Sequence, residues 1–358
     1  MARNHAIGLD IGTTSVRAAE VSLGATPPRL ERYGQVSLPP GAVRDGEVVD
    51  VEAVGQAIKQ LWSHVRFGGK KVILGVANQR VVVRQVDLLW MPDKELKKSL
   101  PMLVQDFVPM PVHEAVLDFV TLAEITGDDQ SRLLRGLLVA AAEEMVVHSA
   151  ESSMRANLVP KVVDLVPFAL VRSLGDVSPM GMNVRPEAVI DIGARVTNIV
   201  VHENGIPRFV RIVLMGGDMV TDALVDRLAM PVADAEATKR RVGINGMNGI
   251  DETDEDLKTA RQTMLGPANT LIDEIRGSLD YYLATSGSQP LSRVYLTGGG
   301  SLLPGLLQQL TAVVRAPVTP GAVFQRLQLG NTGLSAEQLQ IVEPSAAVPI
   351  GLALWGAL

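Results

Sequence analysis

Two stretches of the chain share one pattern of apolar and polar positions. Residues 7–17 read IGLDIGTTSVR and residues 188–198 read AVIDIGARVTN. Each has an apolar run, an aspartate, a glycine two positions later, a short polar turn and a second β-prone run, which predicts a β-hairpin. The aspartates, Asp10 and Asp191, stand about half of the 358-residue chain apart. We therefore expect two similar halves of one fold, each opening with a hairpin.

Strands and helices follow one another in both halves. We expect strands at 6–9, 16–21, 189–192, 196–201 and 208–213, the last after the turn Glu203-Asn204-Gly205, and a helix at 233–242. The apolar run at 346–358 is too short to cross a membrane and contains Pro349, so it predicts a buried C-terminal helix without a basic membrane-binding face. Strand meanders followed by helices predict an α/β fold with mixed sheets.

The segment at 82–158 has its own pattern and predicts a small inserted α+β domain. Strands are expected at 81–88, 116–122 and 133–141, and a helix at 143–157. A further helix would start at Pro92 or Asp93 and end before Pro109, although Pro101 is unfavourable inside it. Its apolar positions form a core face rather than a partner groove, and they are Leu96, Leu100, Leu103, Val104 and Phe107.

Composition and missing motifs limit the classes of function. Hydrophobic residues make up 47% of the chain, which predicts a buried core, while a net charge of −6 and 4% aromatic residues disfavour nucleic-acid binding. Without cysteine the chain has no disulfides, and the sequence before Asp10 lacks a signal-peptide core, so we expect a cytoplasmic protein. The Walker phosphate loop, the nucleophile elbow and metal-spaced histidines are absent. The acidic cluster at 251–256, after a Gly/Asn loop at 243–249, predicts a solvated helix N-terminus rather than an EF-hand.

Both hairpin turns are suited to bind anionic oxygens. After Asp10, Gly12 permits a sharp turn whose amides can point into one concavity, and Thr13, Thr14 and Ser15 add hydroxyl groups. Asp10 would repel phosphate unless a hard cation, most simply Mg²⁺, lay between them. The second turn repeats the plan after Asp191, with candidate residues Gly193, Ala194, Arg195 and Thr197. Two facing hairpins predict a clamp around one polyphosphate, with both aspartates beside the metal.

A third glycine-rich stretch, VYLTGGGSLLPG at 294–305, follows another predicted strand. Gly298, Gly299 and Gly300 would let a flat ligand approach the backbone, and a helix N-terminus after them favours an anion. Ser301 is placed to cap that helix, with Pro304 in its first turn.

The two hairpins and the triple-glycine stretch, in this order, resemble the phosphate and adenosine motifs of the actin-like ATPase superfamily (actin, Hsp70, sugar kinases, FtsA). Within it, the chain is similar to the PilM family of type IV pilus assembly proteins. This similarity rests on residues 8–12, 16–20, 108–111, 163–164, 168–170, 216–221, 235–239 and 351–354. It implies two ribonuclease H-like halves. The first comprises residues 1–81, 159–186 and 341–358, and the second comprises residues 187–340, with a subdomain at about 231–265. An FtsA/PilM-type domain would be inserted at 82–158.

The resemblance also implies binding of ATP and Mg²⁺ and assigns roles to residues. Asp10 and Asp191 would hold Mg²⁺ through water. Arg17, where the family often has lysine, would contact the phosphates, and Glu236 and Lys239 would reach the ribose or base. The other implied nucleotide contacts are Gly12, Thr13, Thr14, Ser15, Gly193, Ala194, Arg195, Thr197, Gly216, Gly217, Gly298, Gly299, Gly300 and Ser301.

One residue departs from the superfamily pattern. Val166 stands where a Glu or Gln commonly orients the attacking water, and an apolar side chain cannot do so. We therefore expect ATP binding with slow or no hydrolysis, and no catalytic residue is assigned.

The resemblance implies a scaffold role in pilus biogenesis and twitching motility. PilM-like proteins bind the N-terminal cytoplasmic peptide of the inner-membrane protein PilN, which implies a peripheral location at the inner face of the cytoplasmic membrane, with other platform proteins or self-association as further contacts. A filament-forming FtsA- or MreB-like protein, a small-molecule kinase and a component of a related type II secretion system are the alternatives.

Overall fold

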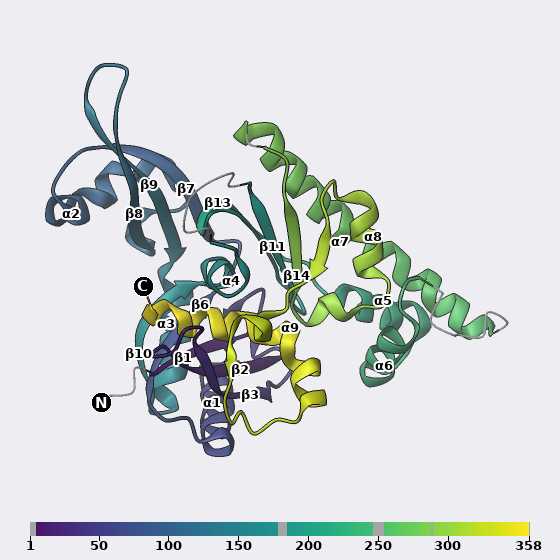
Figure 1. Cartoon of the computed structure of the whole chain (residues 1–358). Coiled ribbons are helices and arrows are strands. Elements are labelled where there is room, and N and C mark those ends of the chain that lie inside the picture. The colour runs from purple at the N-terminus through teal and green to yellow at the C-terminus, as the bar shows by residue number, and fades with distance from the viewer. Residues whose placement is uncertain (1–4, 178–184, 246–253, 288, 358) are drawn as a thin grey trace.

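The computed structural model describes residues 5–177, 185–245, 254–287 and 289–357. Two large sheets lie on either side of a shared pair of helices, and a smaller unit projects beside them (Figure 1). Parts of the segments expected as a Gly/Asn loop (243–249) and an acidic helix start (251–256) lie outside the described residues. Within the described chain, no helix combines the length and apolar character needed to cross a membrane.

The first sheet has the strand order β10-β6-β1-β2-β3-β16. Its strands are β1 (His5–Ile11), β2 (Ser15–Ser22), β3 (Arg29–Ser37), β6 (Lys71–Val76), β10 (Val159–Leu165) and β16 (Gln328–Leu329), with a separate ribbon of β4 (Val43–Arg44) and β5 (Glu47–Val48). Helices α1 (Val51–Val65) and α3 (Glu143–Arg155) cover its outer face. β16 belongs to this sheet although its residues fall in the range assigned from the sequence to the second half.

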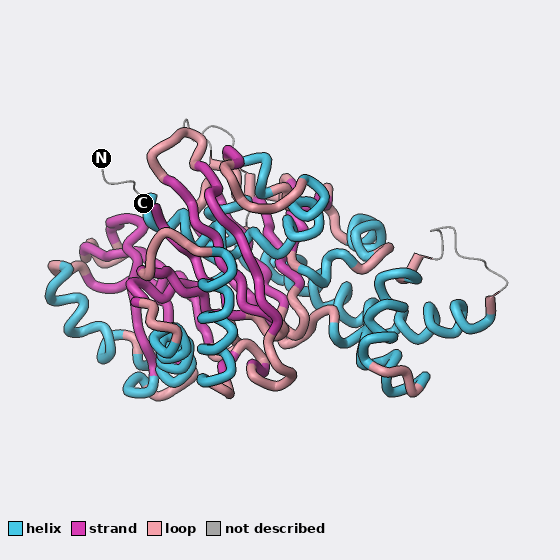
Figure 2. The backbone as a smooth tube through the Cα atoms, turned by 90° about the horizontal axis from the view of Figure 1, so that it is seen from below, coloured by secondary structure: helices cyan, strands magenta, loops and turns pink. Residues whose placement is uncertain are grey.

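The second sheet has the order β13-β12-β11-β14-β15. Its strands are β11 (Glu187–Ile192), β12 (Thr197–Glu203), β13 (Ile206–Val213), β14 (Arg293–Thr297) and β15 (Val318–Pro320). Apolar side chains of this sheet form one core with residues of four helices, namely α5 (Asp218–Leu228), α6 (Val232–Val242), α7 (Glu255–Ser286) and α8 (Leu306–Val313). One end of α7 extends with α6 away from the sheets (Figure 2).

Helices α4 (Val166–Leu174) and α9 (Ala336–Ala353) fill the space between the two sheets. Their apolar side chains share one core with Ala19 and Val21 of the first sheet and Val189 and Val200 of the second. The buried C-terminal helix is confirmed, but α9 begins earlier than expected, where Ser335 and Gln338 form a capping box.

A three-stranded sheet of order β7-β9-β8 and a helix form the projecting unit. It contains β7 (Val81–Leu89), α2 (Asp93–Leu103), the 3₁₀ turns η1 (Gln105–Phe107) and η2 (Val112–Glu114), β8 (Ala115–Thr126) and β9 (Arg132–Ala142). Buried Leu96, Leu100 and Val104 confirm the expected core face. α2 ends at Leu103, shortly after Pro101, so Phe107 lies in η1 and is partly exposed.

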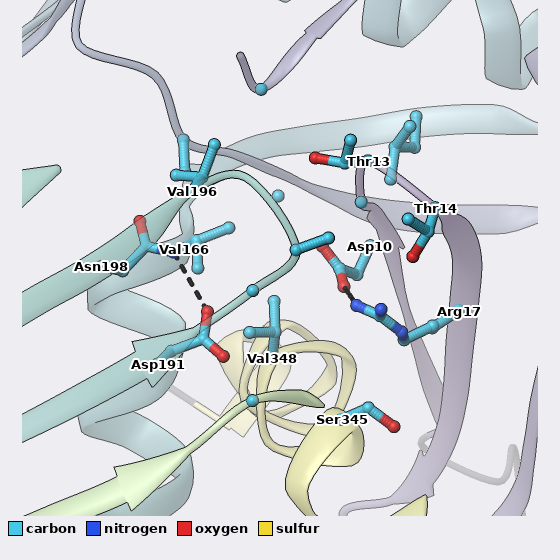
Figure 3. Close-up of a pocket in the computed structure, with 18 of the residues that line it drawn as sticks. Asp10, Thr13, Thr14, Arg17, Val166, Asp191, Val196, Asn198, Ser345 and Val348 are labelled. Atoms are coloured by element: carbon cyan, nitrogen blue, oxygen red, sulfur yellow. Dashed lines mark hydrogen bonds and ion pairs between the residues drawn. The ribbon is translucent and has the colours of Figure 1, made fainter. Parts of the chain in front are cut away.

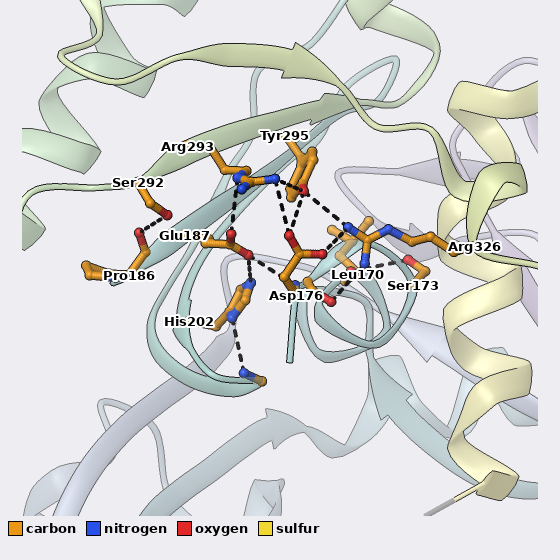
Figure 4. A network of polar contacts seen from close by, with 12 residues as sticks. Leu170, Ser173, Asp176, Pro186, Glu187, His202, Ser292, Arg293, Tyr295 and Arg326 are labelled. Atoms are coloured by element: carbon orange, nitrogen blue, oxygen red, sulfur yellow. Dashed lines mark hydrogen bonds and ion pairs between the residues drawn. The ribbon is translucent and has the colours of Figure 1, made fainter. Parts of the chain in front are cut away.

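A polar network connects α4 to the second sheet (Figure 4). Asp176, just after α4, accepts hydrogen bonds from Tyr295 of β14 and from Arg326 of η4 (Val323–Arg326), and it pairs with Arg293. The backbone N–H of Asp176 donates to Glu187 of β11. The end of α4 is therefore fixed to the second sheet.

Candidate functional site

The two predicted hairpins have the same turn. The N–H of Gly12 donates to the carbonyl of Ser15 over 3.0 Å, and that of Gly193 donates to the carbonyl of Val196 over 2.9 Å. The repeat read from the sequence is thus also a repeat of backbone geometry.

In each hairpin the residue opposite the aspartate binds its carboxylate. Arg17 Nη1 donates to Asp10 Oδ2 over 3.0 Å, and Asn198 Nδ2 donates to Asp191 Oδ2 over 3.1 Å. The two positions are equivalent, but one carries a cation and the other a neutral amide.

Asp10 and Asp191 line the same pocket between the sheets (Figure 3). α4 and α9 contribute Val166, Ser345 and Val348 to its wall. The predicted site residues that line this pocket are Asp10, Gly12, Thr13, Thr14, Arg17, Asp191, Gly193, Ala194, Gly298 and Gly299. The pocket encloses about 70 Å³, well below the roughly 300–1,000 Å³ of a typical small-molecule site.

Burial raises the pKa of both carboxyl groups. Burial, followed by the charge of Asp10, raises the pKa of Asp191 to about 6, and the hydrogen bond from Asn198 acts in the opposite direction. Burial also raises the pKa of Asp10, while the neighbouring Arg17 lowers it. A cation beside both groups would therefore stabilise their charged forms.

The triple-glycine loop is attached to α9 and to the second hairpin. Gly298 has φ +86°, and a Cβ there would lie 2.3 Å from the carbonyl oxygen of Ile192. Its N–H donates to the carbonyl of Pro344 over 2.9 Å. A Cβ at Gly299, by contrast, would meet nothing within 4 Å. Gly298 is required by packing, whereas Gly299 leaves open space beside the pocket.

The expectation that Ser301 caps the following helix is wrong. A 3₁₀ turn, η3 (Gly299–Leu302), intervenes, and α8 begins only at Leu306 after its N-cap Gly305. Ser301 Oγ instead donates to the carbonyl of Gly298 over 2.6 Å.

Arg195, Thr197 and Ser15 are among the predicted contacts that do not line this pocket. Arg195 turns to α5, where its guanidinium pairs with Asp218 and Asp222. The Thr197 hydroxyl is fully buried and donates to the carbonyl of Met215. Ser15 lies in β2 and its side chain is not part of the pocket wall.

A second group of predicted residues packs behind the Gly193–Ala194 turn. The N–H of Gly217 donates to the carbonyl of Gly193 over 2.9 Å, and a Cβ on Gly217 would lie 3.3 Å from Gly300 Cα and 3.6 Å from Lys239 Nζ. Lys239 is buried and donates to Thr221 and to the carbonyl of Gly217, beside Glu236. The structure thus brings together Gly216, Gly217, Glu236, Lys239 and Gly300, next to the pocket rather than in its wall.

The donor set suits one hard cation bound together with phosphate. Among the described residues, no group of three or more His, Cys, Asp or Glu side chains could hold a metal by itself. Mg²⁺ is commonly held by one or two carboxylates, with waters and phosphate oxygens completing its shell. The two buried carboxylates of Asp10 and Asp191, on one pocket, fit that requirement.

Sequence reasoning missed several pocket residues. Asn198, Ser149, Ser345 and Val348 line it, from β12, α3 and α9. Asn198 is the last residue of the second repeated stretch (188–198) and sits at the hairpin position equivalent to Arg17, so the repeat itself contained the signal. α3 and α9 reach the pocket only through the tertiary fold.

A larger cavity of about 450 Å³ lies elsewhere, between α1, β3 and α9. Leu61, Val65, Leu334, Ile341 and Val342 form much of its wall, which contains no Asp, Glu, Lys or Arg. This cavity therefore lacks the carboxylates and the arginine that line the smaller pocket.

Comparisons with known proteins agree with the duplicated fold. The chain resembles the solved PilM-PilN type IV pilus biogenesis complex (TM-score 0.80, 29% identity, covering 99% of this chain and 98% of that one). It is 24% identical to the cell division protein FtsA of Neisseria meningitidis over 88% of this chain and 83% of that protein. The fold also resembles the ethanolamine utilization protein EutJ from Carboxydothermus hydrogenoformans (TM-score 0.54, 15% identity, 98% and 89% covered).

A sequence model described as Type IV pilus assembly protein PilM matches residues 8–357, which is nearly the whole chain. Together with the two hairpins that meet at one pocket, this match establishes the family and the actin-like ATPase fold. The chain belongs to the PilM family of type IV pilus assembly proteins.

Proposed function

We propose that this protein is a cytoplasmic ATP-binding scaffold of the type IV pilus assembly platform. The observation that carries the proposal is that Asp10 and Asp191, from equivalent hairpins of the two halves, line one pocket together with Gly298 and Gly299. The turns at Gly12 and Gly193 would hold the phosphates from opposite sides. Asp10 and Asp191 would hold Mg²⁺ through water, and the ion would neutralise phosphate charge.

In this proposal, nucleotide binding would separate the two halves. The pocket of about 70 Å³ is too small for a nucleoside triphosphate. The group formed by Gly217, Glu236, Lys239 and Gly300 borders the Gly193 turn, so opening on this side would extend the pocket toward the proposed ribose and adenine contacts. Bound ATP would then stabilise one arrangement of the two halves around the pocket.

The test is a thermal shift with Mg-ATP on the wild type, Asp10→Ala and the exposed-surface control Asp273→Ala. At 100 times its dissociation constant, a ligand stabilises the folded state by about 2.7 kcal/mol. We expect that shift in the wild type and the control but not in Asp10→Ala. An absent wild-type shift would refute nucleotide binding.

Hydrolysis is proposed to be slow or absent because Val166 lines the pocket where a water-orienting side chain would be needed. Phosphate release by the purified protein measures this directly. A turnover of several per second would contradict it.

The proposed partner is the N-terminal cytoplasmic segment of PilN, which would link the protein to the inner membrane. Support comes from the similar PilM-PilN complex and from exposed apolar side chains on the projecting unit, namely Leu89, Trp90, Met102, Phe107, Val116 and Val120. Calorimetry with a PilN N-terminal peptide from the same genome tests it. We expect Val120→Asp to weaken binding at least tenfold and the control Val232→Asp, which lies on α6 and is more exposed, to leave it unchanged.

An ATP-dependent filament is the second candidate, because FtsA is similar over 88% of the chain. Sedimentation with and without ATP distinguishes the two, since a scaffold stays in the supernatant.

A further inference from the structure

The cavity between α1, β3 and α9 lies at the edge of the first sheet. The sheet ends in the order β2-β3-β16, and β16 pairs with β3 only at Arg29 and Leu30. The N–H of Gly330, just after β16, donates to the carbonyl of Leu30 over 2.8 Å. Beyond Leu30, no strand in the described part of the chain pairs with this side of β3.

Backbone groups of two β3 residues face this open edge. The N–H of Leu38 donates to the carbonyl of Thr14 over 2.9 Å, so this position of the β2–β3 ladder is hydrogen bonded. Hydrogen-bonded and non-hydrogen-bonded pairs alternate along an antiparallel ladder. In the observed register, Gly34 is therefore bonded to β2, whereas the N–H and C=O groups of Tyr33 and Gln35 point away from β2.

Side chains enclose this edge from both faces of the sheet. On the face covered by α1, a Cβ on Gly34 would clash with Val65. On the opposite face, the hydroxyl groups of Tyr33 and Ser345 of α9 are hydrogen bonded over 3.2 Å. Residues of both helices line the cavity together with Tyr33, Gly34 and Gln35. The cavity therefore occupies the position that the next strand of the sheet would take.

We propose that this edge binds an extended segment of a partner protein, which adds to the first sheet as a strand beside Tyr33 and Gln35. Main-chain hydrogen bonds would provide affinity, and contacts of alternate side chains would provide specificity. The chain's own β16 shows that the edge accepts a strand, because it pairs with the neighbouring positions of β3 in parallel register.

The cavity wall determines the chemistry of that segment. Its apolar residues are Leu61, Val65, Leu334, Ile341 and Val342. A charged side chain would lose water here without meeting an Asp, Glu, Lys or Arg in the wall. Ile341 is 69% exposed, so an apolar partner side chain would cover it. The segment is therefore uncharged where it enters the cavity, with β-branched or aromatic residues at alternate positions.

Edge-to-edge pairing of two copies is a poorer fit to this site. The β3 edge of a second copy would lie between its own α1 and α9, and paired strands must approach to about 4.8 Å. A single extended segment can enter between the helices, whereas a second recessed edge cannot.

The probe is an eight-residue peptide selected from a random library on the full-length protein, with Ile341→Lys used for counter-selection. Because Ile341 is exposed, this variant should unfold at the wild-type midpoint. We expect peptides with alternating apolar residues that still bind two controls like the wild type. Val232→Lys is matched in exposure at 66% and lies on α6, and Val120→Asp alters the proposed PilN site. Loss of every peptide in the counter-selection would overturn the inference.

Methylation of peptide amides distinguishes strand addition from simple apolar binding. Only alternate N–H groups of an added strand face β3, so methylating one alternate set should weaken binding about tenfold or more, and methylating the other set should change it less than about twofold. Binding that survives methylation at every position would overturn the inference.

Hydrogen exchange in the protein gives a second measurement. Bound peptide should slow exchange of the Tyr33 and Gln35 amides about tenfold or more, and change that of Gly34 less, because β2 already protects it. Unchanged Tyr33 and Gln35 amides would overturn the inference, as would protection that rises with protein concentration without peptide, which indicates self-pairing. None of these outcomes involves nucleotide or PilN, so the proposed function is tested separately.

Discussion

Arg17 and Asp10 face each other across the first hairpin, and Arg17 Nη1 donates to Asp10 Oδ2 over 3.0 Å. Both side chains are largely buried, and the charges of Asp10 and Asp191 raise the pKa of Arg17 against the effect of its burial. This pair balances part of the negative charge that the two hairpins bring into one pocket.

Arg17→Ala should lower the free energy of unfolding by about 3 kcal/mol at pH 7.5, because it leaves a buried carboxylate without its partner. Arg17→Lys should lose less, since it keeps the charge but not the planar geometry. Urea denaturation measures the change. Arg276→Ala, which removes an exposed pair with Asp273, should cost less than about 1 kcal/mol. Equal losses in the two alanine variants would contradict the role given to Arg17.

Gly298 and Gly299 provide a matched pair of substitutions. Gly298→Ala should destabilise the protein by more than about 3 kcal/mol, because its Cβ would lie 2.3 Å from a backbone oxygen at φ +86°. Gly299→Ala should stay within about 0.5 kcal/mol of the wild type, since its Cβ meets nothing within 4 Å.

If the open space at Gly299 admits nucleotide, Gly299→Val should weaken the Mg-ATP thermal shift while leaving the unliganded midpoint unchanged. An unchanged shift would show that the ligand does not approach this loop.

We predict that the buried His202 makes the folded protein less stable in acid. It is fully buried in β12, and burial lowers its pKa to about 4. Between pH 6.5 and 4 the unfolded chain binds this proton and the folded chain does not, so stability falls as the pH falls through that range, by at most about 3 kcal/mol from this group.

His202→Gln, which keeps an acceptor for the N–H of Gly205, should flatten the stability curve over that range. Chemical denaturation of both proteins at pH 7 and pH 4.5 measures the difference. Parallel curves for wild type and variant would show that the pKa of His202 does not change on folding.

Asp176 is expected to hold the end of α4 on the second sheet (Figure 4). Because its side chain is about half exposed, solvent screening limits the loss in Asp176→Ala to about 1–2 kcal/mol. Hydrogen exchange should accelerate in the last turn of α4 but not in the first, where Val166 is buried. Uniform exchange along α4 in the variant would argue against this local anchor.

Local patterns determined much of this protein. The hairpins at Asp10 and Asp191, the strands of the projecting unit, α6 and the buried C-terminal helix follow from alternation, turn residues and helical spacing, which act over a few neighbouring positions. The equivalence of the two halves, and hence the meeting of Asp10 and Asp191, also follows from the repeated motif.

Only the tertiary structure decided which way the remaining side chains point. Arg195 turns to Asp218 and Asp222, and Lys239 is buried against Gly217, because each finds its partner on a segment distant in sequence. Ser301 bonds back to nearby Gly298, because a 3₁₀ turn rather than the helix follows the loop directly. Asn198 and Ser345 enter the pocket through strand register and through the packing of α9 between the sheets. Long-range packing and hydrogen bonding, not local propensity, fix these contacts.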